Sequence, residues 1–137
     1  MTMTTLPGGV LLVNTTAPHL ASLPACRAAL LDTRRHGQPA ALIACLPADV
    51  GEDARLAVCE LMQYVDLCVI DRASAALIGV ENEKTHPDLA AALVRKLIKR
   101  FALGGVVLPE EGYARLDSPT AQRIYPAITA WFNKSKK

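Results

Sequence analysis

Aromatic residues are scarce in this sequence, since Phe, Trp and Tyr together make up 4% of its 137 residues. Apolar residues nevertheless make up 51%, so a core would have to be built from Ala, Leu, Val and Ile. A chain of this length can enclose one such core. We therefore expect a single domain over residues 1–137, with residues 1–9 and 134–137 flexible.

The sequence also lacks a long apolar run and a basic segment in front of its first apolar stretch. A membrane-spanning helix needs about 20 apolar residues, and a secretory signal begins with a basic region. Neither a membrane association nor secretion is therefore expected, and the expected location is the cytoplasm.

No Cys-x-x-Cys pair occurs among the four cysteines, which are Cys26, Cys45, Cys59 and Cys68. No histidine lies near them at the spacing that zinc ligands usually have. We therefore expect four reduced and buried thiols that pack as small apolar side chains.

Neither sign of charge is in clear excess, because the formal net charge is only +2. Three of the lysines lie in the last four residues, at Lys134, Lys136 and Lys137. Total charge therefore gives no indication of nucleic-acid binding, and such a function would depend on where the charges lie.

Alternating strand-like and helix-like segments predict an α/β fold with a mixed sheet flanked by helices. Apolar runs predict strands at 10–13, 39–46, 65–70, 75–80 and 106–108. Helical periodicity and capping residues predict helices at 20–36, 55–64, 87–103 and 118–132. The polar segment 71–74 is predicted to be the turn of a β-hairpin that joins two of these strands.

Three acidic residues are expected to meet at the open end of this hairpin. Asp66 begins one strand, whereas Glu81 and Glu83 end the other and point to the same side, because side chains alternate along a strand. Three converging carboxylates would form a hard-oxygen site suited to Mg²⁺. A magnesium ion there could activate water for phosphodiester hydrolysis.

The helix predicted at 87–103 has one apolar and one basic face. A rotation of roughly 100° per residue places Arg95, Lys96 and Lys99 on the basic face. Together with Lys84, which precedes the helix, these cations could contact the phosphates of a nucleic acid.

The segment 64–101 reads YVDLCVIDRASAALIGVENEKTHPDLAAALVRKLIKRF. It resembles the PD-(D/E)xK nuclease superfamily, in particular a bacterial family of nuclease-like domains. The resemblance implies a restriction-endonuclease-like αβββαβ core at 20–36, 39–46, 66–71, 76–83, 87–103 and 106–108, with an extra N-terminal strand and C-terminal helix. It also implies that Asp66 and Glu81 bind the metal, that Glu83 takes the place of a second acid, and that His86 matches the family's histidine.

Three functions fit these observations. The first is a Mg²⁺-dependent nuclease with Asp66, Glu81 and Glu83 as catalytic and metal-binding residues. The second is a non-catalytic accessory or regulatory module of the same fold that binds DNA or a protein partner, or forms a homodimer. It is favoured by the short chain and by Glu83, where the family usually has a lysine. The third is a doubly wound sheet that binds a small molecule at the ends of its strands.

Overall fold

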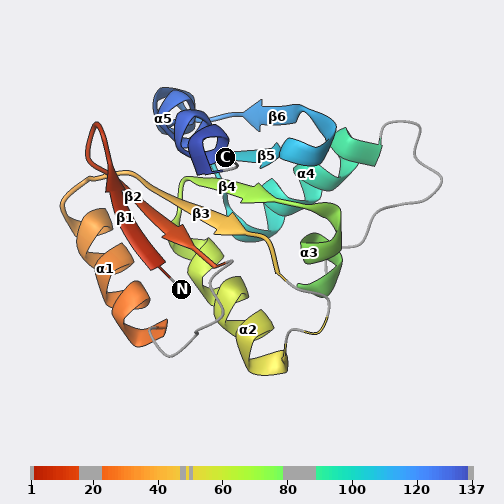
Figure 1. Cartoon of the computed structure of the whole chain (residues 1–137), viewed down its shortest axis with the longest axis horizontal. Helices are drawn as coiled ribbons and strands as arrows, with labels where there is room; N and C mark the ends of the chain where they lie inside the picture. Colours follow the sequence, from red (N-terminus) through yellow and green to blue (C-terminus); the bar gives the residue numbers. More distant parts are fainter. Residues whose placement is uncertain (1, 16–22, 47–48, 50, 79–88, 136–137) are drawn as a thin grey trace.

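The computed structural model describes residues 2–15, 23–46, 49, 51–78 and 89–135 (Figure 1). Its strands are β1 (Thr2–Leu6), β2 (Val10–Asn14), β3 (Ala40–Ala44), β4 (Leu67–Ile70), β5 (Gly105–Leu108) and β6 (Tyr113–Leu116). Its helices are α1 (Leu23–Arg35), α2 (Glu52–Leu61), α3 (Arg72–Leu77), α4 (Leu89–Phe101) and α5 (Pro119–Ser135), with short 3-10 helices η1 (Met62–Tyr64) and η2 (Pro109–Glu111). Within the described ranges, no helix is both long enough and apolar enough to cross a membrane.

The strands form one six-stranded sheet in sequence order, β1-β2-β3-β4-β5-β6. Strands β2 to β5 are parallel to one another, whereas β1 and β6 pair antiparallel at the two edges. Right-handed crossovers that all progress in one direction place the connecting helices on the same face of a sheet. Helices α1 to α4 accordingly share one face, and α5 covers the other (Figure 1).

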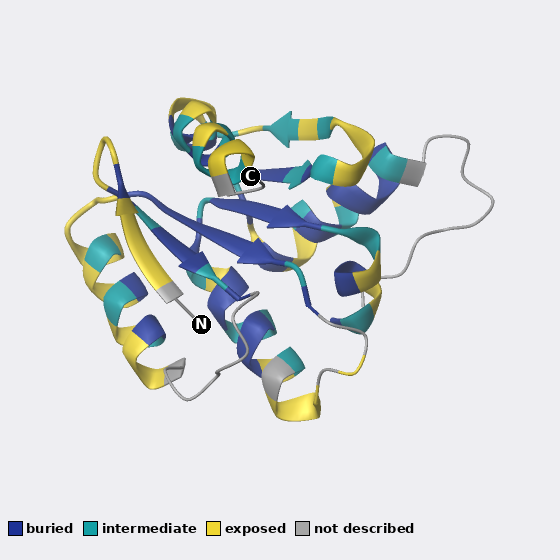
Figure 2. Ribbon diagram, viewed as in Figure 1, coloured by how far each residue is buried: buried dark blue, intermediate teal, exposed yellow. Residues whose placement is uncertain are grey.

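The core therefore has two layers, one on each face of the sheet, and the central strands are buried in both (Figure 2). Sheet residues that face α1 to α4 include Val13, Leu42, Cys68 and Val106. Sheet residues that face α5 include Leu12, Ile43, Leu67 and Val69, which pack with Ala121, Ile124 and Ile128 of that helix. Burial on both faces explains why the parallel strands are continuous apolar runs in the sequence.

The prediction of a β-hairpin between 65–70 and 75–80 is wrong. Strand β4 is present, but Arg72–Leu77 forms α3 instead of a turn and a second strand. Asp71 caps this helix, since its side chain accepts a hydrogen bond from the backbone N–H of Ser74 at 2.6 Å. Ala75 within α3 and Ile78 at its end are buried and pack into the core.

The mixed α/β sheet flanked by helices is confirmed, but the restriction-endonuclease-like core is not. That core requires a strand directly after β4, and α3 occupies the first part of the segment assigned to it. The rest of that segment, 79–83, lies outside the described residues. The structure also contains β1 and β6, which the sequence analysis did not predict as strands.

Candidate functional site

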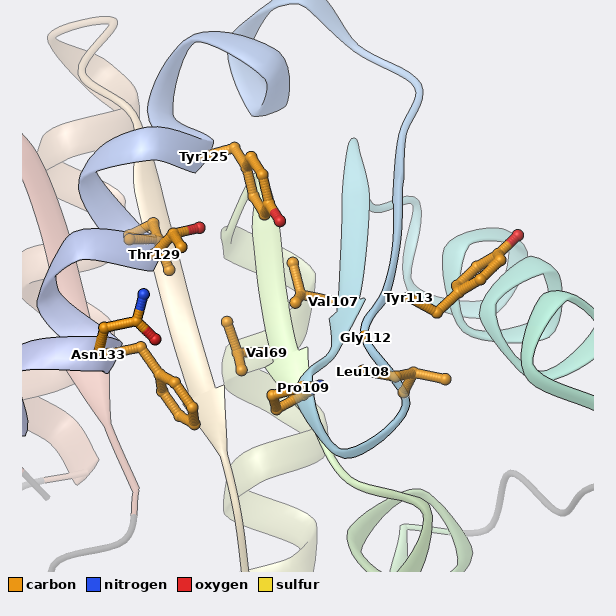
Figure 3. Close-up of a pocket in the computed structure, with 11 residues that line it drawn as sticks. Val69, Val107, Leu108, Pro109, Gly112, Tyr113, Tyr125, Thr129 and Asn133 are labelled. Carbon is orange, nitrogen blue, oxygen red and sulfur yellow. The ribbon is translucent and has the colours of Figure 1, made fainter. Parts of the chain in front are cut away.

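A cavity of about 190 Å³ lies between α5 and the carboxyl halves of β4 and β5 (Figure 3). Val69 of β4 and Val107 of β5 form its floor, and Pro109 and Gly112 border it where the chain turns from β5 into β6. The side chains that α5 contributes are Tyr125, Ile128, Thr129, Phe132 and Asn133.

The helical spacing of these α5 residues places them on one side of the helix, three or four positions apart. Ile128 is buried, Tyr125, Thr129 and Phe132 are half-buried, and Asn133 is exposed. Figure 3 shows Tyr125, Thr129 and Asn133 on the helix side of the cavity, across from Val69 and Val107. The cavity thus has an apolar floor and aromatic side chains on the helix, and the side chains of Tyr125, Thr129 and Asn133 can form hydrogen bonds.

Tyr113 and Leu108 contribute little side chain to this cavity. Figure 3 shows both side chains on the opposite side of the sheet. Leu108 belongs to the core layer under α1 to α4, and Tyr113 packs against that layer. The aromatic rings available to a ligand in this cavity are therefore those of Tyr125 and Phe132.

Acidic side chains gather next to the cavity at the carboxyl edge of the sheet. Arg72, at the start of α3, forms an ion pair with Glu111 of η2. The backbone N–H of Arg72 also donates to Glu110 Oε1 at 3.4 Å. Because Asp71, Glu110 and Glu111 outnumber Arg72 here, this edge favours neutral or cationic groups over bare phosphates.

Cys45 follows β3 at the same edge and remains a neutral thiol at physiological pH. Burial is the main cause that raises its pKa to about 11, and the neighbouring Asp71 and Glu110 raise it further. Burial likewise raises the pKa of Cys68. All four cysteines are free, with Cys26 and Cys68 buried and Cys45 and Cys59 half-buried. A thiol with a raised pKa is a poor nucleophile, so Cys45 is not a candidate for covalent catalysis.

Asp66, the first residue of the predicted metal site, lies at the amino end of β4, away from the cavity. Its Oδ2 accepts a hydrogen bond from the backbone N–H of Ala40 at 3.0 Å. Its backbone carbonyl accepts from the N–H groups of Gly104 and Gly105, at 2.9 and 3.1 Å. Asp66 therefore joins the starts of β3, β4 and β5.

The other predicted metal ligands, Glu81 and Glu83, lie outside the described residues, as do Lys84 and His86. The hairpin that was to bring the carboxylates together is not formed. In the described part of the chain, no group of three or more His, Cys, Asp or Glu side chains could hold a metal ion.

The two faces predicted for the basic helix are present in α4. Leu93, Val94 and Leu97 are buried against the sheet. Arg95 and Lys99 are exposed and Lys96 is half-buried. The amphipathic pattern therefore reflects packing of α4 on the sheet, with its charges on the solvent side.

No family model and no curated protein matches this sequence. Its structure is similar to the crystal structure of 2-dehydro-3-deoxygluconokinase from Thermotoga maritima, with a TM-score of 0.61 and 13% identity over 69% of this chain and 30% of that chain. It is also similar to a PfkB protein from Polaromonas sp. JS666, with a TM-score of 0.55 and 18% identity over 72% of this chain and 33% of that chain. The chain thus spans about a third of the length of these structures.

These neighbours overturn the resemblance to PD-(D/E)xK nucleases. By their names, one is a 2-dehydro-3-deoxygluconokinase and the other a PfkB protein, and the likeness at this low identity shows the fold alone. The predictions of nuclease activity and of nucleic-acid binding are therefore wrong. The resemblance was misleading because the local pattern fits two structures equally well. A strand followed by α3 and a β-hairpin both accommodate an acidic residue, an apolar run, a short polar segment and a second apolar run.

The cavity residues were missed because they come from three separate segments of the sequence, at 69, 107–113 and 125–133. The periodic stripe on 118–132 was recognised, but such a stripe normally indicates only the buried face of a helix. The available signal was the presence of polar Thr129 and Asn133 among the aromatic positions of that stripe. Without a structure, nothing places them opposite Val69 and Val107.

Proposed function

We propose that this chain is a kinase-like domain that binds the nucleoside part of a phosphoryl donor in the cavity between α5 and the sheet. The position of the cavity carries the proposal, because ligands of open α/β sheets bind outside the carboxyl ends of the strands. One of the similar structures is a 2-dehydro-3-deoxygluconokinase, and a kinase transfers a phosphoryl group. This proposal is closest to the third hypothesis from the sequence, a small molecule bound at the strand ends.

The lining of the cavity suits a flat heterocyclic ring. Val69 and Val107 offer an apolar surface to one face of such a ring, and Tyr125 and Phe132 supply aromatic contacts from α5. The carboxamide of Asn133 has both a donor and an acceptor, and this pair of groups matches the edge of adenine. Sites for drug-sized molecules are roughly 300–1,000 Å³, so about 190 Å³ suits a base better than a complete nucleotide.

The phosphates of a bound nucleotide would extend toward the turn at 109–112. Glu110 and Glu111 are in that turn, and the nearby cation Arg72 is already paired with Glu111. Repulsion from these carboxylates would weaken the binding of a metal-free triphosphate, and a divalent cation would relieve it. We therefore assign nucleoside binding to this chain, and we assign phosphoryl transfer to an assembly in which further residues bind the phosphates.

Isothermal titration of adenosine, ATP and Mg²⁺–ATP into the chain tests the proposal. We expect adenosine to bind, Mg²⁺–ATP to bind, and ATP with a metal chelator to bind more weakly than either. Thr129→Leu should fill the cavity and abolish binding, whereas Ala130→Leu, at the adjacent exposed position, should not change it. The proposal fails if the wild-type chain binds none of these ligands, or if both variants behave alike.

A further inference from the structure

We infer that the chain has a second ligand site, at the amino edge of the sheet, for a small zwitterion of the amino-acid kind. A cavity of about 230 Å³ lies there, bordered by the ends of α1 and η1 and by the first turn of α5. It shares no residue with the nucleoside cavity, which lies toward the carboxyl ends of the strands. Its polar side chains are Arg34, Gln38, Gln63, Tyr64, Asp66 and Thr120.

Two opposite charges line this cavity without contacting each other. The Nη1 of Arg34 donates to the backbone carbonyl of Gln63 at 3.4 Å, which holds the guanidinium at the rim. Asp66 uses Oδ2 to accept from the N–H of Ala40 at 3.0 Å. Within the described ranges, neither Arg34 nor Asp66 forms an ion pair. A molecule that carries a carboxylate and an ammonium group can bridge such a gap.

The side chains of Arg34 and Asp66 determine how each charged group of the ligand binds. A guanidinium binds a carboxylate through two parallel hydrogen bonds, so the ligand carboxylate is placed on Arg34. The Oδ1 of Asp66 has no protein partner in the described part of the chain, so it is free to accept from the ligand ammonium.

Uncharged polar groups complete the site. The side chains of Gln38, Gln63 and Thr120 form no hydrogen bond with other described residues. They can therefore bind a polar side chain of the ligand, such as the amide of glutamine or the hydroxyl of serine. The single aromatic residue, Tyr64, packs its ring against the core layer, so this cavity offers no stacking surface for a heterocycle.

Ligands with one charge fit less well. A phosphate or a simple carboxylate would pair with Arg34 but would be repelled by Asp66, whereas a simple amine would leave Arg34 without an anion. The cavity volume of about 230 Å³ is below the roughly 300 Å³ at which pockets for drug-sized molecules begin, which favours a small ligand. This inference does not depend on nucleoside binding, since the two cavities lie at opposite edges.

Chemical-shift titration of the ¹⁵N-labelled chain tests the site with L-glutamine and L-serine as probes. We expect saturable shifts at the backbone amides of Gln38, Gln63 and Thr120. Lactate lacks the ammonium group and ethanolamine lacks the carboxylate. Each should bind at least about tenfold more weakly than the amino acids, which corresponds to a loss of about 1.4 kcal/mol in binding free energy.

Three variants complete the test. Arg34→Gln and Asp66→Asn should each weaken binding of the better probe about tenfold or more. Asp66→Asn keeps an oxygen that can accept from Ala40, so the fold should be retained. Arg35→Gln, an exposed neighbour outside the cavity, should bind as the wild type does. The inference is overturned if neither probe gives saturable shifts at these amides, if lactate binds equally well, or if Arg34→Gln and Arg35→Gln behave alike. Adenosine titration of the same samples reports separately on the nucleoside cavity.

Discussion

Gly104 lies so close to Ser118 that a Cβ atom at position 104 would come within 2.2 Å of the Ser118 Oγ. The contact belongs to a compact junction between the start of β5 and the start of α5. The Gly104 carbonyl accepts from the N–H groups of Asp117 and Ser118, at 2.7 and 3.0 Å. The Ser118 Oγ in turn accepts from the N–H of Ala121 at 3.0 Å and so caps α5. This junction fixes where α5 begins and thus how its side chains reach the nucleoside cavity.

Gly104→Ala should therefore destabilise the fold. The added methyl group would also meet the Ser118 Cβ at 2.9 Å and the Asp66 carbonyl at 3.0 Å, so rotation of one hydroxyl cannot relieve the clash. We expect a loss of about 1–3 kcal/mol in the free energy of unfolding, measured by urea denaturation. Gly51→Ala is the control for an added Cβ without a clash, because no atom lies within 4 Å of it and the φ of Gly51 is −72°. Gly51 is the N-cap of α2, where Ala is less favourable than Gly, so we expect a loss of less than about 1 kcal/mol there. Equal losses in the two variants would show that the junction is not tightly packed.

Ser74→Ala should also destabilise the fold, through a buried backbone group. The Ser74 side chain is fully buried, and its Oγ accepts from the backbone N–H of Leu46 at 2.7 Å. Alanine would leave that N–H without a partner, which costs about 1–3 kcal/mol. Ala73→Ser, at the adjacent exposed position, should change the free energy of unfolding by less than about 0.5 kcal/mol. A Ser74→Ala variant as stable as the wild type would mean that water or a shifted backbone satisfies Leu46.

The same serine shows why part of the fold could not be predicted from the sequence. The spacing Asp71-x-x-Ser74 is compatible with a polar turn and with a helix cap, and Ala75 to Ile78 is apolar under either assignment. The buried hydrogen bond between Ser74 and Leu46 favours the helix, and that contact spans 28 residues in the sequence. Local pattern alone therefore could not distinguish α3 from a hairpin strand.

The parallel strands were predictable for the opposite reason. Val10–Val13 and Ala40–Ala44 are continuous apolar runs because both of their faces are covered, and this burial can be recognised without knowing the partner strands. The edge strand β1 is different, since Met3, Thr4 and Thr5 are exposed and its strand character depends on pairing with β2. The nucleoside cavity is harder still to predict from the sequence, because β4, β5 and α5 form it only after the sheet is assembled.

Cys45 should react slowly with alkylating reagents and should make stability depend on pH. Its folded-state pKa of about 11 lies above the ordinary value of 9.0, chiefly because of burial and next because of Asp71. Between these two pH values the unfolded chain loses the thiol proton while the folded chain keeps it. The contribution of Cys45 to stability is therefore complete below about pH 9 and is lost as the pH rises toward 11.

Two variants check this prediction. Cys45→Ala should reduce the fall in the free energy of unfolding between pH 9 and 11, measured by urea denaturation at each pH. Asp71→Asn can still cap α3 but removes a negative charge beside the thiol, so iodoacetamide should alkylate Cys45 faster at a given pH than in the wild type. Alkylation of wild-type Cys45 at the rate of an unhindered thiol would contradict the raised pKa.

Asn133 should determine how strongly the nucleoside cavity binds an adenine ring. The residue is on the last turns of α5, and its carboxamide borders the cavity next to Thr129 (Figure 3). A good pair of hydrogen bonds between a carboxamide and adenine contributes about 1–3 kcal/mol, and the exposure of Asn133 favours the lower end of that range. Asn133→Ala should therefore raise the dissociation constant for adenosine about tenfold in isothermal titration. Lys134→Ala changes the adjacent exposed residue, which does not line the cavity, and should leave that constant unchanged. If Asn133→Ala binds adenosine as the wild type does while Thr129→Leu abolishes binding, the cavity holds the nucleoside by apolar contacts and Asn133 does not contact the base.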